Sequence, residues 1–286
     1  MSAPRLTWLY VPATRPDRVR KALELDTDAV IVDLEDAVAP ADKDAARTAL
    51  ARTLTHTSPT PHLQVRINGP SSPWHHADAE AVAVLTAVES VRLPKVESAD
   101  DVARVRDRLR KDQVVHPLVE TPRAVAALED LCNAPGVGGV SLGEADLRTA
   151  FRSSDPSVMQ QVRINLVLAS AAAGLPAPMG AAYVNVTDVV GLSADTRSLA
   201  RQGFLGRTAL HPRQLAPIRG AFAPSDAEYA AARQVLASVR DPETDSGAAA
   251  LQDGTFVDRA VLQRAQQTVD LWNHCHPDAS SPKGLP

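Results

Sequence analysis

The stretch AVIVDLEDAVAPADKDAARTAL at 29–50 shows the pattern on which the fold of this chain depends. It begins with a run of branched apolar residues, Ala29–Glu35, and continues after a polar turn into Ala41–Thr53, which is rich in alanine and has helical spacing. A short apolar strand followed by a longer helix is the repeating unit of a parallel α/β sheet. The stretch therefore predicts one strand and its following helix.

The same unit recurs along most of the chain. Eight strands are predicted, at Leu6–Pro12, Ala29–Glu35, Leu63–Ile67, Val91–Pro94, Val114–Glu120, Gly139–Gly143, Ala177–Ala181 and Phe204–Leu210. The helices that alternate with them are predicted at Pro16–Leu25, Ala41–Thr53, His75–Val88, Ser98–Arg110, Pro122–Leu131, Ser157–Ala173, Ala194–Arg201 and Pro212–Phe222. Eight such pairs predict a (β/α)8 TIM barrel, whereas a doubly wound sheet would usually have fewer strands and a switch point.

The segment after the barrel has a different organisation. We expect the barrel to span residues 1–222 as the catalytic domain. Two amphipathic segments, Ser225–Val239 and Asp258–Trp272, flank a polar linker and predict a C-terminal helical extension over 223–275. Residues 276–286 are rich in proline and serine and are expected to be a disordered tail.

The composition is that of a globular protein. Of 286 residues, 44% are hydrophobic and 22% are charged, and the formal net charge of -4 argues against nucleic acid and anionic membranes as partners. No apolar run is long enough to cross a bilayer. The two cysteines, Cys132 and Cys275, have no metal-ligand or redox spacing and are expected to be reduced thiols, so the cytoplasm is the expected compartment.

Charged side chains gather where the predicted strands end. The active site of a (β/α)8 barrel is built from these strand ends and the loops that follow them. The polar residues found there are Arg15, Asp33, Glu35, Asp36, Arg66, Asn68, Lys95, Glu97, Glu120, Glu144, Asp146 and His211. Because the acids outnumber the nearby bases, this set indicates a divalent cation with oxygen ligands.

Three positions have competing interpretations. Glu120 and Asp146 end neighbouring strands and are the best metal-ligand pair, although either could instead cap the helix that follows it. Arg66 is the candidate carboxylate clamp, and its alternative is a surface ion pair. Lys95 could form a Schiff base, but the surrounding acids favour a protonated, charge-balancing lysine. The chain has no glycine-rich loop of the Rossmann or Walker type.

Seven motifs in order carry a resemblance that runs from about Leu9 to Ala265. They are LYVPATRPDRVRKAL at 9–23, AVIVDLEDAVAPADKDAAR at 29–47, VRINGPSSPW at 65–74, RLPKVESADD at 92–101, LVETPRAV at 118–125, SLGEADL at 141–147 and GFLGRTALHPRQL at 203–215. The sequence resembles the citrate lyase beta subunit-like branch of the HpcH/HpaI aldolase/citrate lyase family. Ala13 and Arg207 depart from the family pattern, which usually has glycine and lysine there.

The resemblance implies a Mg²⁺-binding (β/α)8 barrel that acts on an acyl-CoA and a 2-keto acid and forms a homotrimer or hexamer. Glu120 and Asp146 take the metal-ligand positions, and Arg66 takes the position that binds the substrate carboxylate. The resemblance further places Glu35 and Asp36 in the same pocket, Arg15 and Lys21 near the CoA, and Asp258 in the active site of a neighbouring subunit as an acid or base.

The reaction that this resemblance implies is the retro-Claisen or retro-aldol cleavage of a 3-hydroxyacyl-CoA thioester of the malyl-CoA or citramalyl-CoA type. Two alternatives remain open from the sequence. The chain could be the beta subunit of a multi-subunit citrate lyase complex, or it could be a metal-dependent aldolase that acts on free hydroxy-keto acids. A thioester hydrolysis step could also follow carbon–carbon bond chemistry in the same site.

Overall fold

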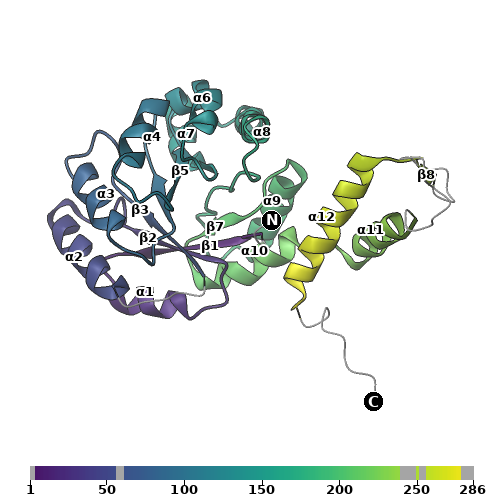
Figure 1. Ribbon diagram of the computed structural model, residues 1–286, viewed down its shortest axis with the longest axis horizontal. Coiled ribbons are helices and arrows are strands. Elements are labelled where there is room, and N and C mark those ends of the chain that lie inside the picture. Colours follow the sequence, from purple (N-terminus) through teal and green to yellow (C-terminus); the bar gives the residue numbers. More distant parts are fainter. Residues whose placement is uncertain (1–3, 56–60, 239–248, 251–255, 278–286) are drawn as a thin grey trace, which may run out of the picture. The chain divides into compact units, whose positions relative to one another are not determined.

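A computed structural model of the chain describes residues 4–55, 61–238, 249–250 and 256–277 (Figure 1). It divides into two compact units, of which the first comprises residues 5–221. The second comprises Pro4 and the described residues from Phe222 onward. Residues 240–248 of the predicted linker, Arg240–Ala249, and residues 278–286 of the predicted tail, 276–286, lie outside the described residues.

The first unit is built on a seven-stranded parallel sheet in the order β6-β5-β4-β3-β2-β1-β7. The strands span Thr7–Pro12 (β1), Ala29–Asp33 (β2), His62–Arg66 (β3), Ser90–Leu93 (β4), Val114–Val119 (β5), Ser141–Leu142 (β6) and Arg207–Ala209 (β7). All five residues of β2 are buried, as expected for a parallel strand that is covered on both faces. The predicted parallel α/β architecture is therefore confirmed.

The eighth predicted strand, Ala177–Ala181, is not a regular strand in the structure. Met179 forms a parallel bridge to Ser141 of β6, and Gly180 forms one to Arg207 of β7. The Met179 N–H donates to Val140 O at 2.9 Å, so hydrogen bonding continues from one edge of the sheet to the other. Pro176 directly precedes this segment and Pro178 lies within it, and because proline has no N–H to donate, a regular strand is disfavoured there.

Helices follow the strands of the first unit and cover the outside of its sheet (Figure 1). They span Pro16–Leu23 (α1), Lys43–Leu54 (α2), His75–Ala83 (α3), Ala99–Arg106 (α4), Pro122–Ala126 (α5), Leu128–Asn133 (α6), Glu144–Phe151 (α7), Pro156–Ala172 (α8), Val189–Arg201 (α9) and Leu215–Phe222 (α10). Short 3₁₀ turns lie at Pro40–Asp42 and Pro212–Gln214. Every predicted helix therefore has a counterpart.

Three details differ from the predicted helices. The segment predicted as one helix at Pro122–Leu131 is broken at Ala127, which leaves the helical region with φ of -107° and ψ of 21°. Helix α7 was not predicted, although its residues carry one of the predicted metal ligands. Helix α9 begins five residues before the predicted start because the Asp188 side chain accepts a hydrogen bond from Gly191 N–H and caps it.

The second unit is a pair of helices, α11 (Asp226–Ser238) and α12 (Arg259–Cys275), with two short antiparallel strands, β8 (Ala249–Ala250) and β9 (Phe256–Val257). Ala232 of α11 packs with Ala265 and Val269 of α12. The Tyr229 and Trp272 rings stack with their centroids 4.0 Å apart. No helix among the described residues is long and apolar enough to span a membrane.

The backbone just before β7 generates a prediction. Gly206 has φ of 97°, and a Cβ at this position would lie 2.4 Å from the backbone oxygen of Arg5. We expect Gly206→Ala to lower the free energy of unfolding by about 2 kcal/mol, because it combines backbone strain with a clash against main chain. Urea denaturation measures the change.

Gly220 is the matched control because it lies in α10 and a Cβ there would meet no atom within 4 Å. Gly220→Ala should leave stability unchanged or raise it by up to about 1 kcal/mol, since alanine favours the helix. Equal effects of the two substitutions would contradict this account of Gly206.

Candidate active site

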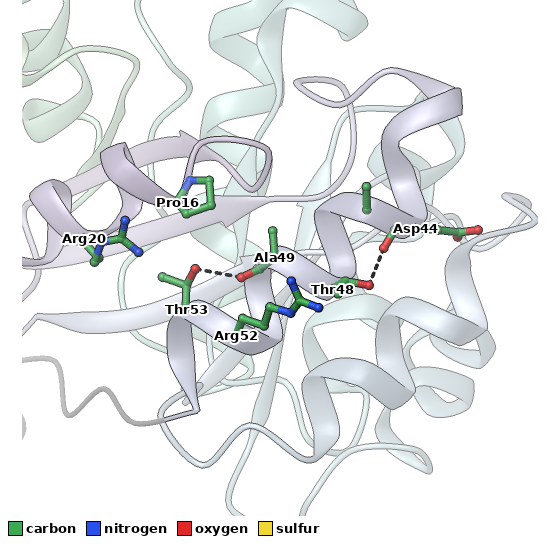
Figure 2. Close-up of a pocket in the computed structure, with 8 residues that line it drawn as sticks. Pro16, Arg20, Asp44, Thr48, Ala49, Arg52 and Thr53 are labelled. Atoms are coloured by element: carbon green, nitrogen blue, oxygen red, sulfur yellow. Dashed lines mark hydrogen bonds between the residues drawn. The ribbon is translucent and has the colours of Figure 1, made fainter.

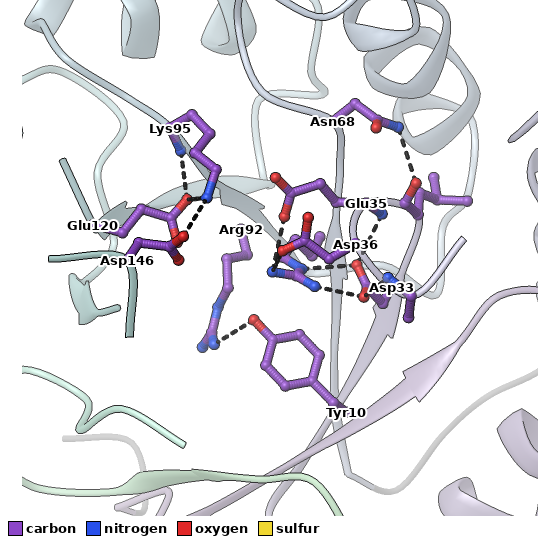
Figure 3. Close-up of polar contacts among 12 residues, drawn as sticks. Tyr10, Asp33, Glu35, Asp36, Asn68, Arg92, Lys95, Glu120 and Asp146 are labelled. Carbon is purple, nitrogen blue, oxygen red and sulfur yellow. Dashed lines mark hydrogen bonds and ion pairs between the residues drawn. The ribbon is translucent and has the colours of Figure 1, made fainter. Parts of the chain in front are cut away.

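Charged residues from four neighbouring strands converge at the carboxyl edge of the sheet (Figure 3). Asp33 and Arg66 are the last residues of β2 and β3, and Glu120 directly follows β5. Because parallel strands end on the same side, residues far apart in the sequence meet there. The structure thus brings together the strand-end acids and bases that the sequence analysis selected.

Asp33 and Arg66 form a two-pronged ion pair. Arg66 Nε donates to Asp33 Oδ1 at 2.7 Å, and Arg66 Nη2 donates to Asp33 Oδ2 at 2.6 Å. Asp33 also accepts hydrogen bonds from the backbone N–H groups of Glu35 and Ala37 at 2.9 and 3.1 Å. One carboxylate therefore orients the guanidinium and shapes the turn that carries the next two acids. The sequence pattern alone does not indicate this role of Asp33.

Glu35 and Asp36 face the remaining end of the same guanidinium. Arg66 Nη1 lies 2.8 Å from Glu35 Oε2 and 3.4 Å from Asp36 Oδ2. The Glu35 oxygen has no hydrogen bond of suitable geometry among the described residues, although the contact is short. Burial raises the pKa of Glu35 to about 8, even though Arg66 opposes the shift. Glu35 therefore holds a proton near neutral pH and can give it up at little cost.

The Lys95 ammonium contacts both predicted metal ligands (Figure 3). Its Nζ is 3.2 Å from Glu120 Oε1 and 3.4 Å from Asp146 Oδ1, and its backbone N–H donates to the same Glu120 oxygen at 2.8 Å. Burial lowers the pKa of Lys95, but Glu120 and Asp146 more than compensate, and the net pKa is raised. The ammonium is therefore protonated and non-nucleophilic, which disfavours the Schiff-base alternative.

Glu120 is held in a tight, buried position. It is 3% exposed, and burial raises its pKa despite the neighbouring ammonium of Lys95. A Cβ on Gly143 would lie 2.5 Å from Glu120 Cβ, so glycine is needed beside it. Asp146 lies in the first turn of α7 and its side chain is half-exposed. The Glu120 carboxylate is thus fixed in position, whereas the Asp146 carboxylate is open to solvent.

The structure contradicts the alternative roles of Glu120 and Asp146 as helix caps and of Arg66 as a surface ion pair. Helix α5 is capped by the Thr121 side chain, and α7 has Gly143 at its N-cap without a side-chain cap, so neither Glu120 nor Asp146 is a helix cap. The Arg66 side chain is 11% exposed, so its ion pairs are not surface contacts. The carboxylate oxygens of Glu120 and Asp146 both contact the Lys95 ammonium, so they lie close enough to share one cation. Carboxylate oxygens are also the ligands that Mg²⁺ prefers.

A second buried network supports the site from behind. The Lys43 ammonium donates to Leu34 O and Glu35 O at 2.7 Å and to Asn68 Oδ1 at 2.8 Å. Asn68 in turn donates to Asp78 Oδ2 at 2.6 Å. Burial lowers the pKa of Lys43, and the surrounding acids, Asp33 and Asp78 first, oppose that shift. The network joins the ends of β2 and β3, and the sequence analysis did not identify Lys43 or Asp78.

Of the other predicted site residues, Arg15 is the N-cap of α1, Lys21 lies within α1, and Asp258 belongs to the second unit. Arg15 is exposed at the start of α1 and pairs with Asp17 at 2.9 Å. Lys21 is exposed in the last turn of α1, roughly 8 Å along the helix axis from its first residue. Asp258 belongs to the second unit, where its side chain caps α12 by accepting from Val261 N–H at 2.9 Å. No described contact joins Arg15 or Lys21 to the acidic cluster.

A pocket of about 590 Å³ lies on the outer face of α1 and α2 (Figure 2). Arg20 and Arg52 contribute its cationic groups, and the Thr48 and Thr53 hydroxyls donate to backbone oxygens of their own helix. None of its lining residues belongs to the acidic cluster. The pocket is therefore a groove between two covering helices and separate from the candidate active site.

The raised pKa of Glu35 generates a stability prediction. The folded value of about 8 lies above the value of about 4.3 for an unfolded chain, so folding disfavours the charged form. The stability contribution is complete below the unfolded pKa and is lost as pH rises through about 8. We expect the stability of the wild type relative to Glu35→Gln to fall between pH 5 and 8 by at most about 1.4 kcal/mol per pH unit. Urea denaturation with EDTA present measures it, and a difference independent of pH would contradict it.

Comparison with known proteins places the chain in a family. The family model for HpcH/HpaI aldolase/citrate lyase matches residues 6–212. The chain is 37% identical to a citrate lyase subunit beta-like protein of Mycobacterium tuberculosis over 91% of this chain and 92% of that protein. It is 32% identical to a (3S)-malyl-CoA thioesterase of Cereibacter sphaeroides, over 91% and 92%.

A solved structure resembles the whole chain. The crystal structure of protein CitE from Mycobacterium tuberculosis, in complex with magnesium, acetoacetate and coenzyme A, aligns with a TM-score of 0.80 at 34% identity. The alignment covers 95% of this chain and 99% of that chain. Together with the family match, this similarity leads to one conclusion: the chain belongs to the HpcH/HpaI aldolase/citrate lyase family.

Proposed function

We propose that the chain is a magnesium-dependent carbon–carbon lyase that cleaves or forms a 3-hydroxyacyl-CoA thioester of the malyl-CoA or citramalyl-CoA type. The observation that carries the proposal is the convergence of the Glu120 and Asp146 carboxylates beside the buried Arg66 guanidinium at one edge of the sheet. The similar CitE structure supports it, since that protein was crystallised with magnesium, a keto acid and coenzyme A.

Glu120 and Asp146 would hold the metal, because they present oxygen donors to a single cation. Two protein carboxylates leave most positions of an octahedral ion for water and substrate. When bound, Mg²⁺ supplies positive charge that polarises the substrate oxygens. The remaining chemistry belongs to the side chains of this chain.

Arg66 would bind the carboxylate of the keto-acid half of the substrate. The Asp33 carboxylate accepts hydrogen bonds from Nε and Nη2 of Arg66 and occupies that edge of the guanidinium. The substrate carboxylate would therefore approach Arg66 at Nη1, where Glu35 and Asp36 now lie. Glu35 is suited to exchange a proton because its pKa of about 8 is close to neutral pH. Asp36, which is exposed at the same turn, would share this acid–base role.

The cleavage reaction balances with these groups. A base takes the proton of the substrate hydroxyl, the oxygen forms the carbonyl of the keto acid, and the adjacent carbon–carbon bond breaks. The electron pair moves into the thioester, which becomes an enolate, and a proton then returns to its carbon to give the acyl-CoA. In the reverse direction the enolate attacks the keto group.

The remaining parts of the proposal concern the whole enzyme. We propose that the seven strands and the bridging segment at Met179–Gly180 function as a (β/α)8 barrel, and that Arg15 and Lys21 lie near the CoA. We also propose a cytoplasmic homotrimer or hexamer in which the C-terminal extension over 223–275 reaches a neighbouring subunit.

A panel of CoA thioesters with Mg²⁺ tests the activity, with keto acids and acyl-CoA products identified by mass spectrometry. We expect EDTA to abolish turnover, and Glu120→Gln or Asp146→Asn to reduce it by about 10²-fold or more because the metal ligands are lost. Glu129→Gln is the matched control, since Glu129 is an exposed acid on α6, and its turnover should equal that of the wild type.

One outcome would overturn the metal mechanism, and two others would favour the alternative functions. Turnover that persists in EDTA, together with trapping of Lys95 by borohydride and substrate, would indicate a Schiff-base aldolase. Cleavage of free hydroxy-keto acids without any CoA ester would instead favour the aldolase alternative, and activity only after addition of other citrate lyase subunits would favour the complex subunit.

A separate prediction concerns Asp258. As an N-cap, it can be replaced by asparagine with little loss of stability, because asparagine caps equally well. If Asp258 acts as an acid or base in a partner's site, Asp258→Asn should keep its stability and Mg²⁺ binding but lose turnover by about 10²-fold or more. Asp270→Asn, an exposed position on the same helix, should remain active.

Mixing Asp258→Asn with an inactive Glu120→Ala chain makes the test decisive. Mixed oligomers would contain sites that combine an intact metal pair from one chain with an intact Asp258 from another. Activity should reappear only in the mixture. Confirmed subunit exchange without any recovery would mean that each site is built from a single chain.

A further inference from the structure

Arg92 is a fully buried cation inside the first unit. It lies on β4, is 1% exposed, and its donors reach only neutral groups. Nε donates to Gln64 Oε1 at 2.8 Å, Nη1 donates to the Tyr10 hydroxyl at 3.1 Å and to Thr208 Oγ1 at 3.2 Å, and Nη2 lies 2.7 Å from Met179 Sδ. Within the described part of the chain, no carboxylate oxygen forms an ion pair with Arg92.

Such a charge is expensive to bury. A cation removed from water loses its solvation, and without a carboxylate only hydrogen bonds and ring contacts offset the loss. The Trp8 and Tyr10 rings lie 5.9 and 5.4 Å from the guanidinium carbon and contribute cation–π attraction. Packing alone would be served better by an apolar side chain, so the guanidinium points to a functional role.

Tyr10 connects Arg92 to the candidate active site (Figure 3). The Arg66 guanidinium carbon lies 4.8 Å from the Tyr10 ring centre, while Arg92 donates to the hydroxyl of the same side chain. Tyr10 is partly buried, so one part of it remains open to solvent. The Tyr10 side chain therefore contacts both the buried Arg92 guanidinium and the Arg66 guanidinium that would bind the substrate carboxylate.

The hydrogen bond fixes how the phenol can act. Arginine has donors only, so the Tyr10 oxygen must be the acceptor in this contact. Its own proton must then point elsewhere, and the described residues provide no acceptor for it. A donor to one lone pair also polarises the O–H bond and makes it a stronger donor. The phenolic proton is thus available to a ligand in the site.

We propose that Tyr10 is a further catalytic residue, whose hydroxyl donates a hydrogen bond to the keto or hydroxyl oxygen of the substrate, and that Arg92 is its positioning residue. The inference rests on the proposed lyase function. In the condensation direction the keto oxygen gains negative charge, and a preorganised donor stabilises that charge most in the transition state. The phenolic proton stays on Tyr10, so the acid–base steps remain with the carboxyl groups.

Tyr10→Phe is the direct test, because it keeps the ring against Arg66 and removes only the hydroxyl. We expect kcat to fall by about 10²-fold, as for the loss of one oxyanion donor, with the KM for the CoA ester changed by less than about threefold. Mg²⁺ affinity, measured by calorimetry, should be unchanged. Thr208→Val is the matched control, since it removes another hydroxyl that accepts from the same Arg92 nitrogen, and its kcat should stay near the wild-type value.

Arg92→Met tests the positioning role. It should lower kcat less than Tyr10→Phe does, and it should add little further loss in the Tyr10→Phe background, since both changes act through one hydrogen bond. Additive losses would instead mean that Arg92 acts independently of Tyr10. Wild-type kcat in Tyr10→Phe would overturn the proposal. Equal losses of kcat in Tyr10→Phe and Thr208→Val would also overturn it, because they would mean that the hydrogen bonds around Arg92 only maintain the fold.

A binding measurement separates this inference from the lyase proposal. Pyruvate offers both a carboxylate and a keto oxygen, and calorimetry of the Mg²⁺-loaded protein gives its Kd without turnover. We expect Tyr10→Phe to raise that Kd by about fivefold, the loss expected for one hydrogen bond. If the wild type cleaves no thioester of the panel, the lyase proposal fails, yet a weakened pyruvate complex in Tyr10→Phe would still support the contact. An unchanged pyruvate Kd together with an unchanged kcat would leave Tyr10 without a role.

Discussion

The paired hydrogen bonds from Arg66 to Asp33 join two strands at the point where both end. The register of the sheet places these residues directly opposite each other, so the fork needs no rearrangement of the backbone. Asp33 also accepts the backbone N–H groups of the following turn, which fixes the direction of Glu35. The position of Arg66, the proposed carboxylate-binding residue, and that of the nearest acid therefore depend on one carboxylate.

The balance of charge at this edge explains why a divalent cation suits it. Five carboxylates make ion-pair contacts with two cationic side chains, Arg66 and Lys95. Burial keeps one of the five, Glu35, protonated near neutral pH. Apart from Glu35, four carboxyl groups contact these two bases, so the acids exceed the bases by two. A site with that excess attracts a small dication and gives it oxygen ligands.

Much of the fold was predictable because each strand and helix leaves a local pattern in the sequence. The strand-end acids were predictable for the same reason, since a parallel sheet gathers its carboxyl ends. The sequence did not reveal helix α7, which is short and begins directly at the strand end. The broken eighth strand follows from its prolines, but the isolated bridges depend on both of its neighbours.

Contacts between distant residues could not be predicted in this way. Alternation along a strand can place Tyr10 and Arg92 on inward faces, but they are 82 positions apart, and only the curvature of the sheet brings them together. The role of Asp33 likewise depends on strand register, which the sequence pattern does not specify. The structure shows Asp258 as the cap of α12, whereas its role toward another subunit stays a prediction.

The backbone of Lys95 has a consequence for the mutational tolerance of the site. Its φ of 52° lies in the left-handed region, which costs a residue with a side chain roughly 1 kcal/mol or more relative to glycine. Glycine would relieve this strain, but it would also remove the ammonium that contacts both Glu120 and Asp146. Selection for thermal stability alone would therefore favour glycine at this position. Directed evolution for a more robust fold would meet a conflict between stability and charge at this one residue.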